Sequence, residues 1–369
     1  MQTHYEDVLS QRSLFVDVKN LGRSTEIRKN NCIRKVYKML NGKTILVTGG
    51  TGSFGHHFVD YVLTHYEPKK IIIYSRDEFK QFIMDNDYKE HRRVLRYFIG
   101  DVRDEARLKM AMKGVDYVIH AAALKQVPAC EYNPNEAIKT NVNGAMNVIN
   151  ASLEADVKKV VALSTDKAVN PINLYGGTKL VSDKLFCAAN AYGGIDGTRF
   201  SVVRYGNVAG SRGSVIPFFQ NIIDNGGKDL PITDYRMTRF WISLEQGVEL
   251  VIKALEESKG GETFISKIPS FKITDLAEAM LPGCNKPEVG IREGEKLHEI
   301  MVTREDSIHT YEYENHYIVY PHYNWWGEKD IIPGGKVVAP EFEYSSGTNS
   351  EWLSVEDLRE KLLTDWDKH

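Results

Sequence analysis

The sequence predicts the α/β fold class, with a doubly wound parallel sheet and a smaller C-terminal lobe. Short apolar runs recur along the first part of the chain, and each is followed by a stretch that suits a helix. The runs are apolar throughout, as in parallel strands that helices cover on both faces. The first run leads directly into a glycine-rich turn and then a helix, which is the order of a Rossmann-type domain.

Six strands are expected, at residues 44–47, 70–74, 96–101, 115–120, 159–164 and 200–204. Helices are expected between them at residues 56–65, at about residues 135–154 and at residues 175–190. In an open parallel sheet with right-handed connections, ligands bind at the carboxyl ends of the strands. We therefore expect the functional site where the strands end. The residues at these ends are Gly49, Asp101, Ala121, Thr165 and Asn207.

Composition divides the chain into three segments. Residues 39–208 are expected to form the Rossmann domain, to which part of residues 236–265 returns, and residues 209–369 mainly a substrate-binding lobe and a C-terminal tail. Residues 1–38 are charged and have no sustained apolar period, so we assign them no structure. Two interpretations of this extension stay open. Either Met39 is the functional start and the extension is dispensable, or the extension is an amphipathic arm that docks on a neighbouring subunit.

Composition also argues against several functional classes. The chain has 369 residues, of which 42% are hydrophobic, so it can bury a sizeable core. Its net charge of −3 gives no strong basic field for binding nucleic acid. No apolar stretch approaches the roughly 18 residues of a membrane span, and the N-terminus has no apolar signal-peptide segment. The four cysteines are far apart, which favours a reducing, cytoplasmic location and predicts neither a disulfide framework nor a metal site.

The glycine-rich turn after the first strand has the spacing of a dinucleotide-binding loop. Glycine permits the tight turn and lets the backbone approach a pyrophosphate. The helix that follows offers free N–H groups and a positive dipole end to the same phosphates. The residues expected to contact the cofactor here are Gly49, Thr51, Gly52, Ser53, Phe54 and Gly55.

The end of the second strand bears on the choice of cofactor. NAD sites usually place an acidic residue there, whereas NADP sites place a cation near the 2′-phosphate. The strand runs into Ser75, Arg76 and Asp77, with Lys80 nearby, so NADP is favoured while Asp77 keeps NAD possible. Asp101, after the third strand, either accepts a hydrogen bond from the adenine or is a surface turn residue. The remaining cofactor-binding residues are expected to be Val102, Ala121, Ala122 and Ala123.

A tyrosine–lysine pair follows the fifth strand. Tyr175 and Lys179 are one helical turn apart, so both side chains face the same side of the expected helix and can also contact the cofactor. The ammonium group stabilises the phenolate and lowers the pKa of the tyrosine toward the working range. Thr165, at the end of the strand, is expected to hydrogen-bond a substrate hydroxyl beside this tyrosine.

Asp166 and Lys167 add an acid and an amine between the strand and the pair. A dehydrogenase needs only the tyrosine and the lysine, so the additional groups suggest an elimination. The competing interpretation is a surface ion pair of little energetic consequence. An elimination requires a raised pKa at Asp166, so that it can donate a proton, and a lowered pKa at Lys167, so that it can act as a base.

These residues lie within longer motifs that resemble the extended short-chain dehydrogenase/reductase superfamily. Within it, the chain is similar to the UDP-N-acetylglucosamine 4,6-dehydratases of the configuration-inverting type, from about residue 43 to residue 362. Retaining, membrane-bound relatives tend to have Met in place of Tyr175, and dehydratases of deoxythymidine-linked glucose carry Asp-Glu in place of Asp166 and Lys167. The motifs that carry the resemblance are TGGTGSFG, YSRDE, FIGDVRD, HAAALKQVP, STDKAVNPINLYGGTK, VVRYGNVAGSRGSVIPFF, MTRFWI, GIREGEKLHE and APEFEYSS.

The resemblance implies a lyase that oxidises C4 of UDP-N-acetylglucosamine, removes water across C5 and C6, and returns hydride to C6. Tyr175 would take the proton of the C4 hydroxyl, Lys167 the C5 proton, and Asp166 would protonate the departing C6 hydroxyl. Reprotonation of C5 from the opposite face gives UDP-2-acetamido-2,6-dideoxy-β-L-arabino-hex-4-ulose, and the cofactor is regenerated in each turnover. The resemblance also implies a homo-oligomer, a dimer or a hexamer. It leaves open whether the product serves flagellin glycosylation through pseudaminic acid or capsule and O-antigen synthesis.

The resemblance further assigns the residues that bind the UDP-sugar. Asn207 and Arg239 are assigned to the diphosphate or the nearby sugar, and the border of the uracil is assigned to Ser214, Val215 and Pro217. Arg292 is assigned to a phosphate and Glu295 to the uridine ribose. Lys125 and Asn173 are assigned to the sugar end.

Two other functions stay open. A nucleotide-sugar 4-epimerase would share Thr165, Tyr175 and Lys179, but it would return hydride to C4 without losing water. Such an enzyme has no need for a base at Lys167. An inactive NADP-binding scaffold has no reason to keep the acid, the base and the tyrosine–lysine pair together. Product mass separates the two enzyme activities, because only dehydration removes a water molecule.

Overall fold

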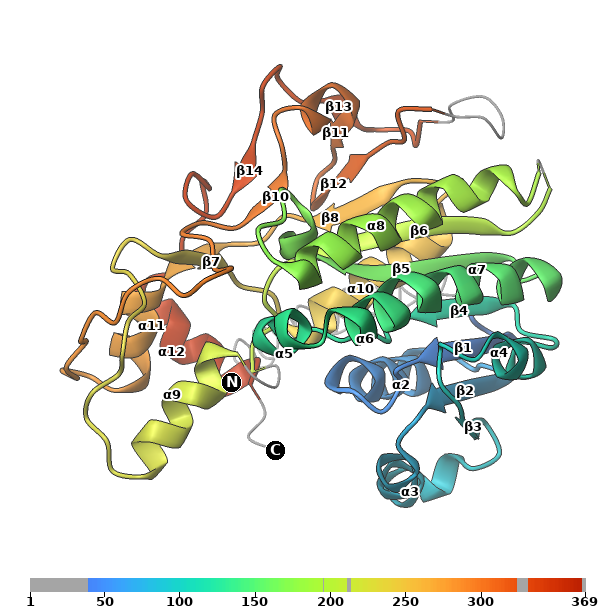
Figure 1. The fold of residues 1–369 in the computed structure, drawn as a ribbon, viewed down its shortest axis with the longest axis horizontal. Coiled ribbons are helices and arrows are strands. Elements are labelled where there is room, and N and C mark those ends of the chain that lie inside the picture. Colours follow the sequence, from blue (N-terminus) through green and yellow to red (C-terminus); the bar gives the residue numbers. More distant parts are fainter. Residues whose placement is uncertain (1–38, 195, 211–213, 324–330, 367–369) are drawn as a thin grey trace, which may run out of the picture.

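The computed structural model describes residues 39–194, 196–210, 214–323 and 331–366. Its centre is a ten-stranded sheet, and the six predicted strands form most of its parallel part (Figure 1). In the sheet they lie in the order β3-β2-β1-β4-β5-β6, which is the Rossmann order. The predicted fold class is therefore confirmed. The bounds are β1 (Thr44–Thr48), β2 (Lys70–Ser75), β3 (Leu95–Ile99), β4 (Tyr117–His120), β5 (Lys159–Thr165) and β6 (Arg199–Tyr205).

The sheet continues past β6 with strands from the second half of the chain. β8 (Thr263–Ser266) pairs parallel with β6, and β12 (His316–Val319) pairs antiparallel with β8. β11 (Thr310–Glu312) and β13 (Lys336–Val337) complete this edge, again antiparallel. The Rossmann strands and these later segments thus share one hydrogen-bonded layer.

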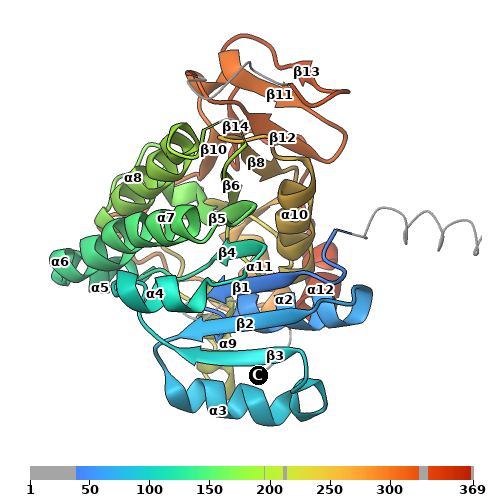
Figure 2. The same ribbon diagram turned by 90° about the vertical axis from the view of Figure 1, so that its right-hand side faces the viewer.

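Helices cover both faces of the sheet, as Figure 2 shows. On one face lie α2 (Ser53–His65) and α10 (Leu244–Glu257), and on the other α4 (Glu105–Ala111), α7 (Gly144–Glu154) and α8 (Leu174–Ala188). Val47 and Phe58 belong to the core under the first pair, and Leu46 and Phe186 to the core on the opposite face. All four side chains are fully buried, and each such side chain contributes about 1.5–3 kcal/mol to stability.

The long helix expected at about residues 135–154 forms, but it is interrupted. It consists of α6 (Pro134–Ile138), a π-helical turn at Lys139–Asn143, and α7. Within that turn the Asn141 amide is hydrogen-bonded to both backbone groups of Leu124, which lies in the loop after β4. Turns of this kind often mark functional sites.

The C-terminal lobe has a third apolar core, which includes Phe219, Trp241 and Leu276. Trp241 donates a hydrogen bond to Asp365 at 2.9 Å, which ties the last described helix to this core. The lobe's helices are α9 (Val215–Asp224), α11 (Ile273–Met280) and α12 (Val355–Thr364). Its small sheets pair β7 (Thr238–Phe240) with β9 (Ser270–Lys272), and β10 (Ile300–Val302) with β14 (Tyr344–Ser345).

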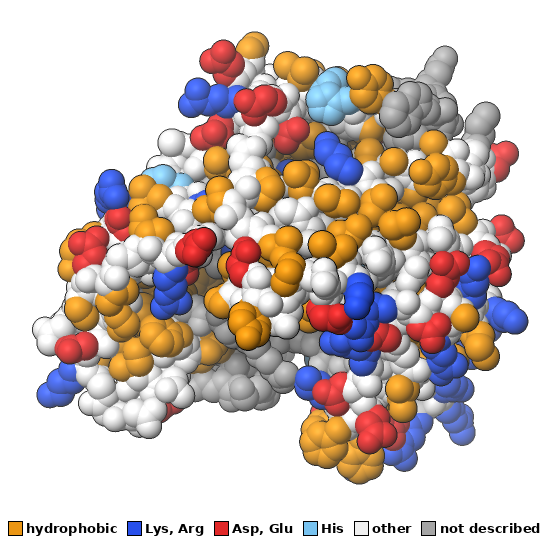
Figure 3. Space-filling view, in the orientation of Figure 1, with side chains coloured by type: hydrophobic (Ala, Val, Ile, Leu, Met, Phe, Trp, Pro, Cys, Tyr) orange, Lys and Arg blue, Asp and Glu red, His pale blue; other side chains and the backbone are white. Residues whose placement is uncertain are grey.

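Two further helices follow strands of the sheet, α3 (Glu78–Asp87) after β2 and α5 (Val127–Tyr132) after β4. Figure 3 shows acidic and basic side chains interspersed over the face it presents, without a large patch of one sign. Among the described residues, the helices are too short or too polar to cross a lipid bilayer.

Candidate active site

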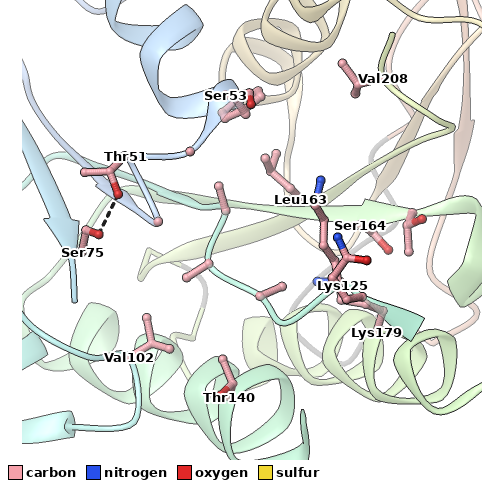
Figure 4. A pocket seen from close by; sticks show the side chains of 18 of the residues that line it. Thr51, Ser53, Ser75, Val102, Lys125, Thr140, Leu163, Ser164, Lys179 and Val208 are labelled. Atoms are coloured by element: carbon pink, nitrogen blue, oxygen red, sulfur yellow. Dashed lines mark hydrogen bonds between the residues drawn. The ribbon is translucent and has the colours of Figure 1, made fainter. Parts of the chain in front are cut away.

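A cavity of about 550 Å³ runs along the carboxyl ends of the parallel strands. Figure 4 shows Thr51 and Ser75 side by side at one end, while Lys125, Ser164 and Lys179 gather at the other. This edge is where a doubly wound sheet binds its ligands. Over the part of the chain that the structure describes, no group of three or more His, Cys, Asp and Glu residues is arranged to hold a metal ion.

The glycine-rich loop between β1 and α2 fits the pyrophosphate of a dinucleotide. Gly49 has a φ of +66°, and a Cβ there would lie 2.9 Å from the Cα of Ala122, so only glycine suits the position. Gly52 precedes α2 and offers no side-chain cap, which leaves the first N–H groups of the helix available to an anion. The Thr51 hydroxyl is hydrogen-bonded to that of Ser75 at 2.8 Å, which fixes the loop against the end of β2.

The charged residues at the end of β2 are partly neutralised by one another. Asp77 caps α3, with Oδ1 accepting from the N–H of Lys80 at 3.0 Å and Oδ2 lying 3.0 Å from its Nζ. These hydrogen bonds to Lys80 lower the pKa of Asp77. The Asp101 carboxylate pairs with Arg103 at 2.6 Å and lies 3.7 Å from Nη1 of Arg76. Both acids near the adenosine end are therefore already paired with cations.

Helix α8 carries Tyr175 and Lys179 to the cavity. A Cβ at Gly176 would overlap the carbonyl group of Lys167, so glycine lets the helix pack directly against the end of β5. Burial raises the pKa of Tyr175 to about 12, although Lys167 and a hydrogen bond with Thr165 act in the opposite direction. The phenol pKa is thus raised rather than lowered as expected, because burial outweighs the effect of the Lys167 ammonium group.

Lys179 lies in a second buried polar cluster. Burial lowers its pKa, and the carboxylate of Asp183 on the next helical turn offsets only part of that effect. Asp183 accepts a hydrogen bond from Ser164 at 2.6 Å and lies 3.8 Å from Nη2 of Arg204. Burial raises the pKa of Asp183 despite these partners. Sequence reasoning missed Asp183, although its position four residues after Lys179 was an available signal.

Asp166 and Lys167 both face inward because the chain turns after β5 into a 3-10 turn at Asp166–Ala168. Asp166 is fully buried, and its Oδ1 accepts from Thr165 Oγ1 at 2.9 Å and from Lys167 Nζ at 3.1 Å. Burial, reinforced by repulsion from Glu299, raises the pKa of Asp166. The expected direction of this shift is confirmed.

The expected lowering of the Lys167 pKa is wrong. Burial acts in that direction, but the carboxylates of Asp166 and Glu299 outweigh it, and the net pKa lies above the ordinary value. Glu299 immediately precedes β10, and its Oε1 lies 3.4 Å from Lys167 Nζ and 3.7 Å from Arg239 Nε. Sequence reasoning missed Glu299, because it lies 132 residues from Lys167 and no local pattern indicates the contact.

Most of the predicted catalytic and cofactor-binding residues line the cavity. They are Gly49, Thr51, Gly52, Ser53, Phe54, Ser75, Arg76, Lys80, Val102, Ala121, Ala122, Ala123, Thr165, Lys167, Tyr175 and Lys179. Gly55, Asp101 and Asp166 do not line it. Gly55 packs against the carbonyl of Gly50, and Asp166 reaches the cavity only through the two lining residues to which it is hydrogen-bonded.

The predicted substrate-binding residues are divided. Lys125, Asn207 and Ser214 line the cavity, and Asn207 Oδ1 accepts from Lys167 Nζ at 3.4 Å. The others lie outside the lining of the cavity and are Asn173, Val215, Pro217, Arg239, Arg292 and Glu295.

Several of these outer residues have partners within the protein. Asn173 caps α8 through its Oδ1 and donates from Nδ2 to the carbonyl of Gly294 at 2.8 Å. Arg239 is buried and donates to the carbonyls of its neighbours at 2.7 and 3.2 Å. Arg292 is mostly exposed, with Nη1 3.9 Å from Glu295. The assigned substrate contacts of these residues stay predictions.

Sequence reasoning also missed part of the cavity wall. Thr140, from the π-helical turn, and Tyr205, at the end of β6, both line it. Next to Thr140, the Asn141 amide donates to Thr178 of α8 at 3.0 Å and so links the loop after β4 to that helix. The apolar pattern over residues 135–154 contains no sign of this turn, since a π-helical turn shifts the register without changing the residue types.

A Rossmann sheet with a glycine-rich loop and a tyrosine–lysine pair at its carboxyl edge defines the class, a short-chain dehydrogenase/reductase that uses a nicotinamide cofactor. Within that class, the chain belongs to the polysaccharide biosynthesis protein family, whose model matches residues 45–321.

Known relatives include both a dehydratase and an epimerase. A Campylobacter jejuni protein named UDP-N-acetylglucosamine 4,6-dehydratase (inverting) is 57% identical over 331 residues, which cover 87% of this chain and 97% of that protein. A UDP-glucose 4-epimerase from Rickettsia canadensis is 43% identical over 335 residues, covering 88% of this chain and 97% of the epimerase. The X-ray structure of Pen from Bacillus thuringiensis superposes with a TM-score of 0.81 at 38% identity, covering 88% of this chain and 98% of Pen.

Proposed function

We propose that the chain is a UDP-N-acetylglucosamine 4,6-dehydratase of the inverting type. The observation that carries this proposal is the hydrogen-bonded pair of the buried Asp166 and the cavity-lining Lys167, which lies against the tyrosine of the redox site. An elimination needs an acid for the departing hydroxyl and a base for the carbon-bound proton, both within reach of the carbon next to the new ketone. The 57% identity to the Campylobacter jejuni dehydratase supports the same assignment.

The oxidation of C4 and the loss of water then have their residues. A bound nicotinamide dinucleotide supplies hydride transfer, from C4 at the start and to C6 at the end. Tyr175 takes the proton of the C4 hydroxyl, and the Thr165 hydroxyl holds that oxygen. The C4 ketone acidifies the proton on C5, which Lys167 removes while Asp166 gives its proton to the C6 hydroxyl, which leaves as water.

The raised pKa of Lys167 is compatible with its role as a base, because the lysine and Asp166 share a hydrogen bond of 3.1 Å. One proton that moves from the ammonium group to the carboxylate produces a neutral amine and a carboxylic acid together. The total charge of the pair does not change. The low-dielectric surroundings therefore do not oppose this proton transfer, as they would oppose the formation of a new net charge. After elimination the amine holds the C5 proton and the carboxylate is ionised again.

NADP is the proposed cofactor. Asp77 and Asp101 are paired with Lys80 and Arg103, which leaves the partly exposed Arg76 as the cation best placed for a 2′-phosphate. Arg76→Ala should weaken NADP binding about ten- to a hundredfold and change NAD binding little, because a charge-assisted hydrogen bond contributes about 1.5–3 kcal/mol. Equal losses for both cofactors would count against the assignment.

A matched control for that titration is Arg93→Ala. Arg93 is another exposed arginine of the same region and lies outside the cavity lining. We also propose a cytoplasmic location, on the cysteine pattern, and a homo-oligomeric state, on the family resemblance.

Incubation with UDP-N-acetylglucosamine in deuterated water tests the activity. The expected product is the 4-keto-6-deoxy sugar nucleotide, one water lighter, with deuterium at C5 and the L-arabino configuration by NMR. A product of unchanged mass with an inverted C4 hydroxyl would instead support the epimerase, the function that the 43% identical Rickettsia canadensis relative bears in its name.

A further inference from the structure

Glu299 is a buried carboxylate that the proposed steps do not use. Its exposed fraction is 2%, and, like Asp166, it lies outside the lining of the cavity. Its Oε1 is the acceptor 3.4 Å from Lys167 Nζ, on a different element from Asp166, the other acceptor at 3.1 Å. The amine that acts as the base is therefore held between two acids.

The position of Glu299 is fixed from behind. Its own N–H donates to Ser346 Oγ at 2.9 Å, and Arg239 Nε lies 3.7 Å from its Oε1. Arg239 is in turn anchored by hydrogen bonds to the carbonyls of Thr238 and Leu297. This framework belongs to the C-terminal lobe, whereas Lys167 belongs to the end of β5, so the contact joins the two parts of the chain at the reacting group.

The charges that face Glu299 are few and can be named. Lys167, Arg239 and Lys296 attract its carboxylate, and Asp166 repels it. The guanidinium group of Arg239 is always charged, and the charge of an ionised Glu299 compensates it. The net charge around the Asp166–Lys167 pair is then that of the pair itself. Removal of the Glu299 charge would leave Arg239 uncompensated beside the amine, and both effects would favour the neutral amine.

We propose that Glu299 is a positioning residue for the elimination: its carboxylate holds the Lys167 amine in place and, together with Arg239, sets the charge of the acid–base pair. Its catalytic consequence rests on the proposed dehydratase activity. The charge relationship itself does not, because it can be measured in the absence of any sugar nucleotide.

The test is the rate at which a small amine-acylating reagent labels Lys167 at one alkaline pH, followed by mass spectrometry and normalised to the exposed Lys113. The labelling rate follows the fraction of neutral amine. Glu299→Gln keeps the shape of the side chain and removes its charge, and we expect it to raise the rate about tenfold, which corresponds to about one pH unit in the titration of the amine. Arg239→Gln should lower the rate, and the double variant should fall between the wild type and Glu299→Gln.

Glu262→Gln is the matched control. Glu262 is 1% exposed, accepts hydrogen bonds from the N–H groups of Lys259 and Gly260, and lies outside the cavity lining. Its substitution should leave the labelling of Lys167 unchanged. Equal labelling rates in the wild type, Glu299→Gln and Arg239→Gln, or the same rise in the Glu262 control, would overturn the proposal. Because Arg239→Gln probes the same charge balance with Glu299 intact, the test survives a failure of Glu299→Gln to fold.

A pH profile of product formation separates this proposal from the proposed function. If the wild type makes the keto sugar, both limbs of the profile should move to lower pH in Glu299→Gln, since both groups of the pair lose a negative neighbour. A merely structural defect would lower the rate without moving the limbs, and that result would contradict a charge-setting role. If the wild type makes no keto sugar, the dehydratase assignment fails while the labelling order still decides the role of Glu299.

Discussion

The turn after β5 and the first turns of α8 each place a lysine at the cavity, and the pKa values of the two lysines shift in opposite directions. Lys167 lies between the carboxyl groups of Asp166 and Glu299, which raise its pKa against the effect of burial. Lys179 has a single carboxyl neighbour, Asp183, and burial lowers its pKa. The same residue type thus acquires opposite shifts within one cavity.

The difference teaches that neighbouring carboxylates, rather than burial, decide what each lysine can do. The amine of Lys167 has an acid 3.1 Å away with which it can exchange a proton, so it suits a step in which one proton leaves carbon and another reaches oxygen. Among the described residues, Asp183 is the one acid that offsets burial at Lys179, and the place of this lysine one turn from Tyr175 suits support of the phenol. We therefore assign elimination to the first lysine and hydride transfer to the second.

The largest effect is expected from Lys167→Met, which keeps an apolar side chain of similar length and removes the base. Formation of the keto sugar should fall about a thousandfold, within the range that a general base contributes. Chromatography of the nucleotide-sugar products measures it. The control is Lys113→Met, at an exposed lysine, which should leave the rate of keto sugar formation unchanged. A loss of less than about tenfold in Lys167→Met would remove the lysine from the chemistry.

A smaller loss is expected from Lys179→Met. This change removes the amine that lines the cavity one helical turn from Tyr175, so keto sugar formation should fall about a hundredfold because C4 is oxidised more slowly. The control is Lys184→Met, at an exposed position of the same helix. If Lys179→Met and Lys184→Met formed the keto sugar at the same rate, Lys179 would have no role in hydride transfer.

The two lysines should also differ in the pH dependence of stability. Because the folded pKa of Lys179 lies below its ordinary value of 10.5, the unfolded state binds more protons in the interval between them, and its contribution to stability rises with pH. The folded pKa of Lys167 lies above 10.5, so its contribution is complete below that value and is lost only at higher pH. Urea unfolding of the wild type and both methionine variants measures these contributions.

As the pH rises from neutral toward the ordinary lysine pKa of 10.5, the difference in unfolding free energy between the wild type and Lys179→Met should therefore move in favour of the wild type. The corresponding difference for Lys167→Met should stay flat over the same interval. If the two differences in unfolding free energy changed with pH in the same way, the pKa values of Lys167 and Lys179 would not be shifted in opposite directions.

The smallest effect is expected at the hydroxyl that serves the Lys179 cluster. Ser164→Ala removes the 2.6 Å hydrogen bond to the buried Asp183 and should cost about 1–3 kcal/mol of stability. Ser201→Ala is the matched control, because Ser201 is equally buried and its hydroxyl has no hydrogen-bond partner among the described residues. Equal unfolding free energies for the two variants would show that the hydrogen bond between Ser164 and Asp183 does not stabilise the fold.

The parts of the site that depend on local sequence were predictable. The apolar runs locate the six Rossmann strands, and the spacing of the glycines locates the loop, where the positive φ of Gly49 explains the residue type. Tyr175 and Lys179 follow from a helical spacing of four residues. The inward direction of the pair at residues 166–167 depends on a 3-10 turn, which the alternation of an extended segment does not predict.

The rest of the site depends on contacts between distant segments. Glu299 approaches Lys167 across 132 residues, and neither sequence neighbourhood marks the contact. Asp166 and, after it, Glu299 raise the pKa of Lys167, so only the part due to Asp166 has a local origin in the sequence. Asp183 is the intermediate case, since its spacing from Lys179 is local but its hydrogen bond to Ser164 crosses from helix to strand.

The most direct measurement is a single turnover of UDP-N-acetylglucosamine on cofactor-loaded enzyme, followed by the absorbance of the reduced nicotinamide. In Lys167→Met the signal should rise and persist, because C4 is oxidised but water is not lost. In Lys179→Met the signal should rise far more slowly. A persistent signal in the second variant with normal turnover in the first would contradict the account.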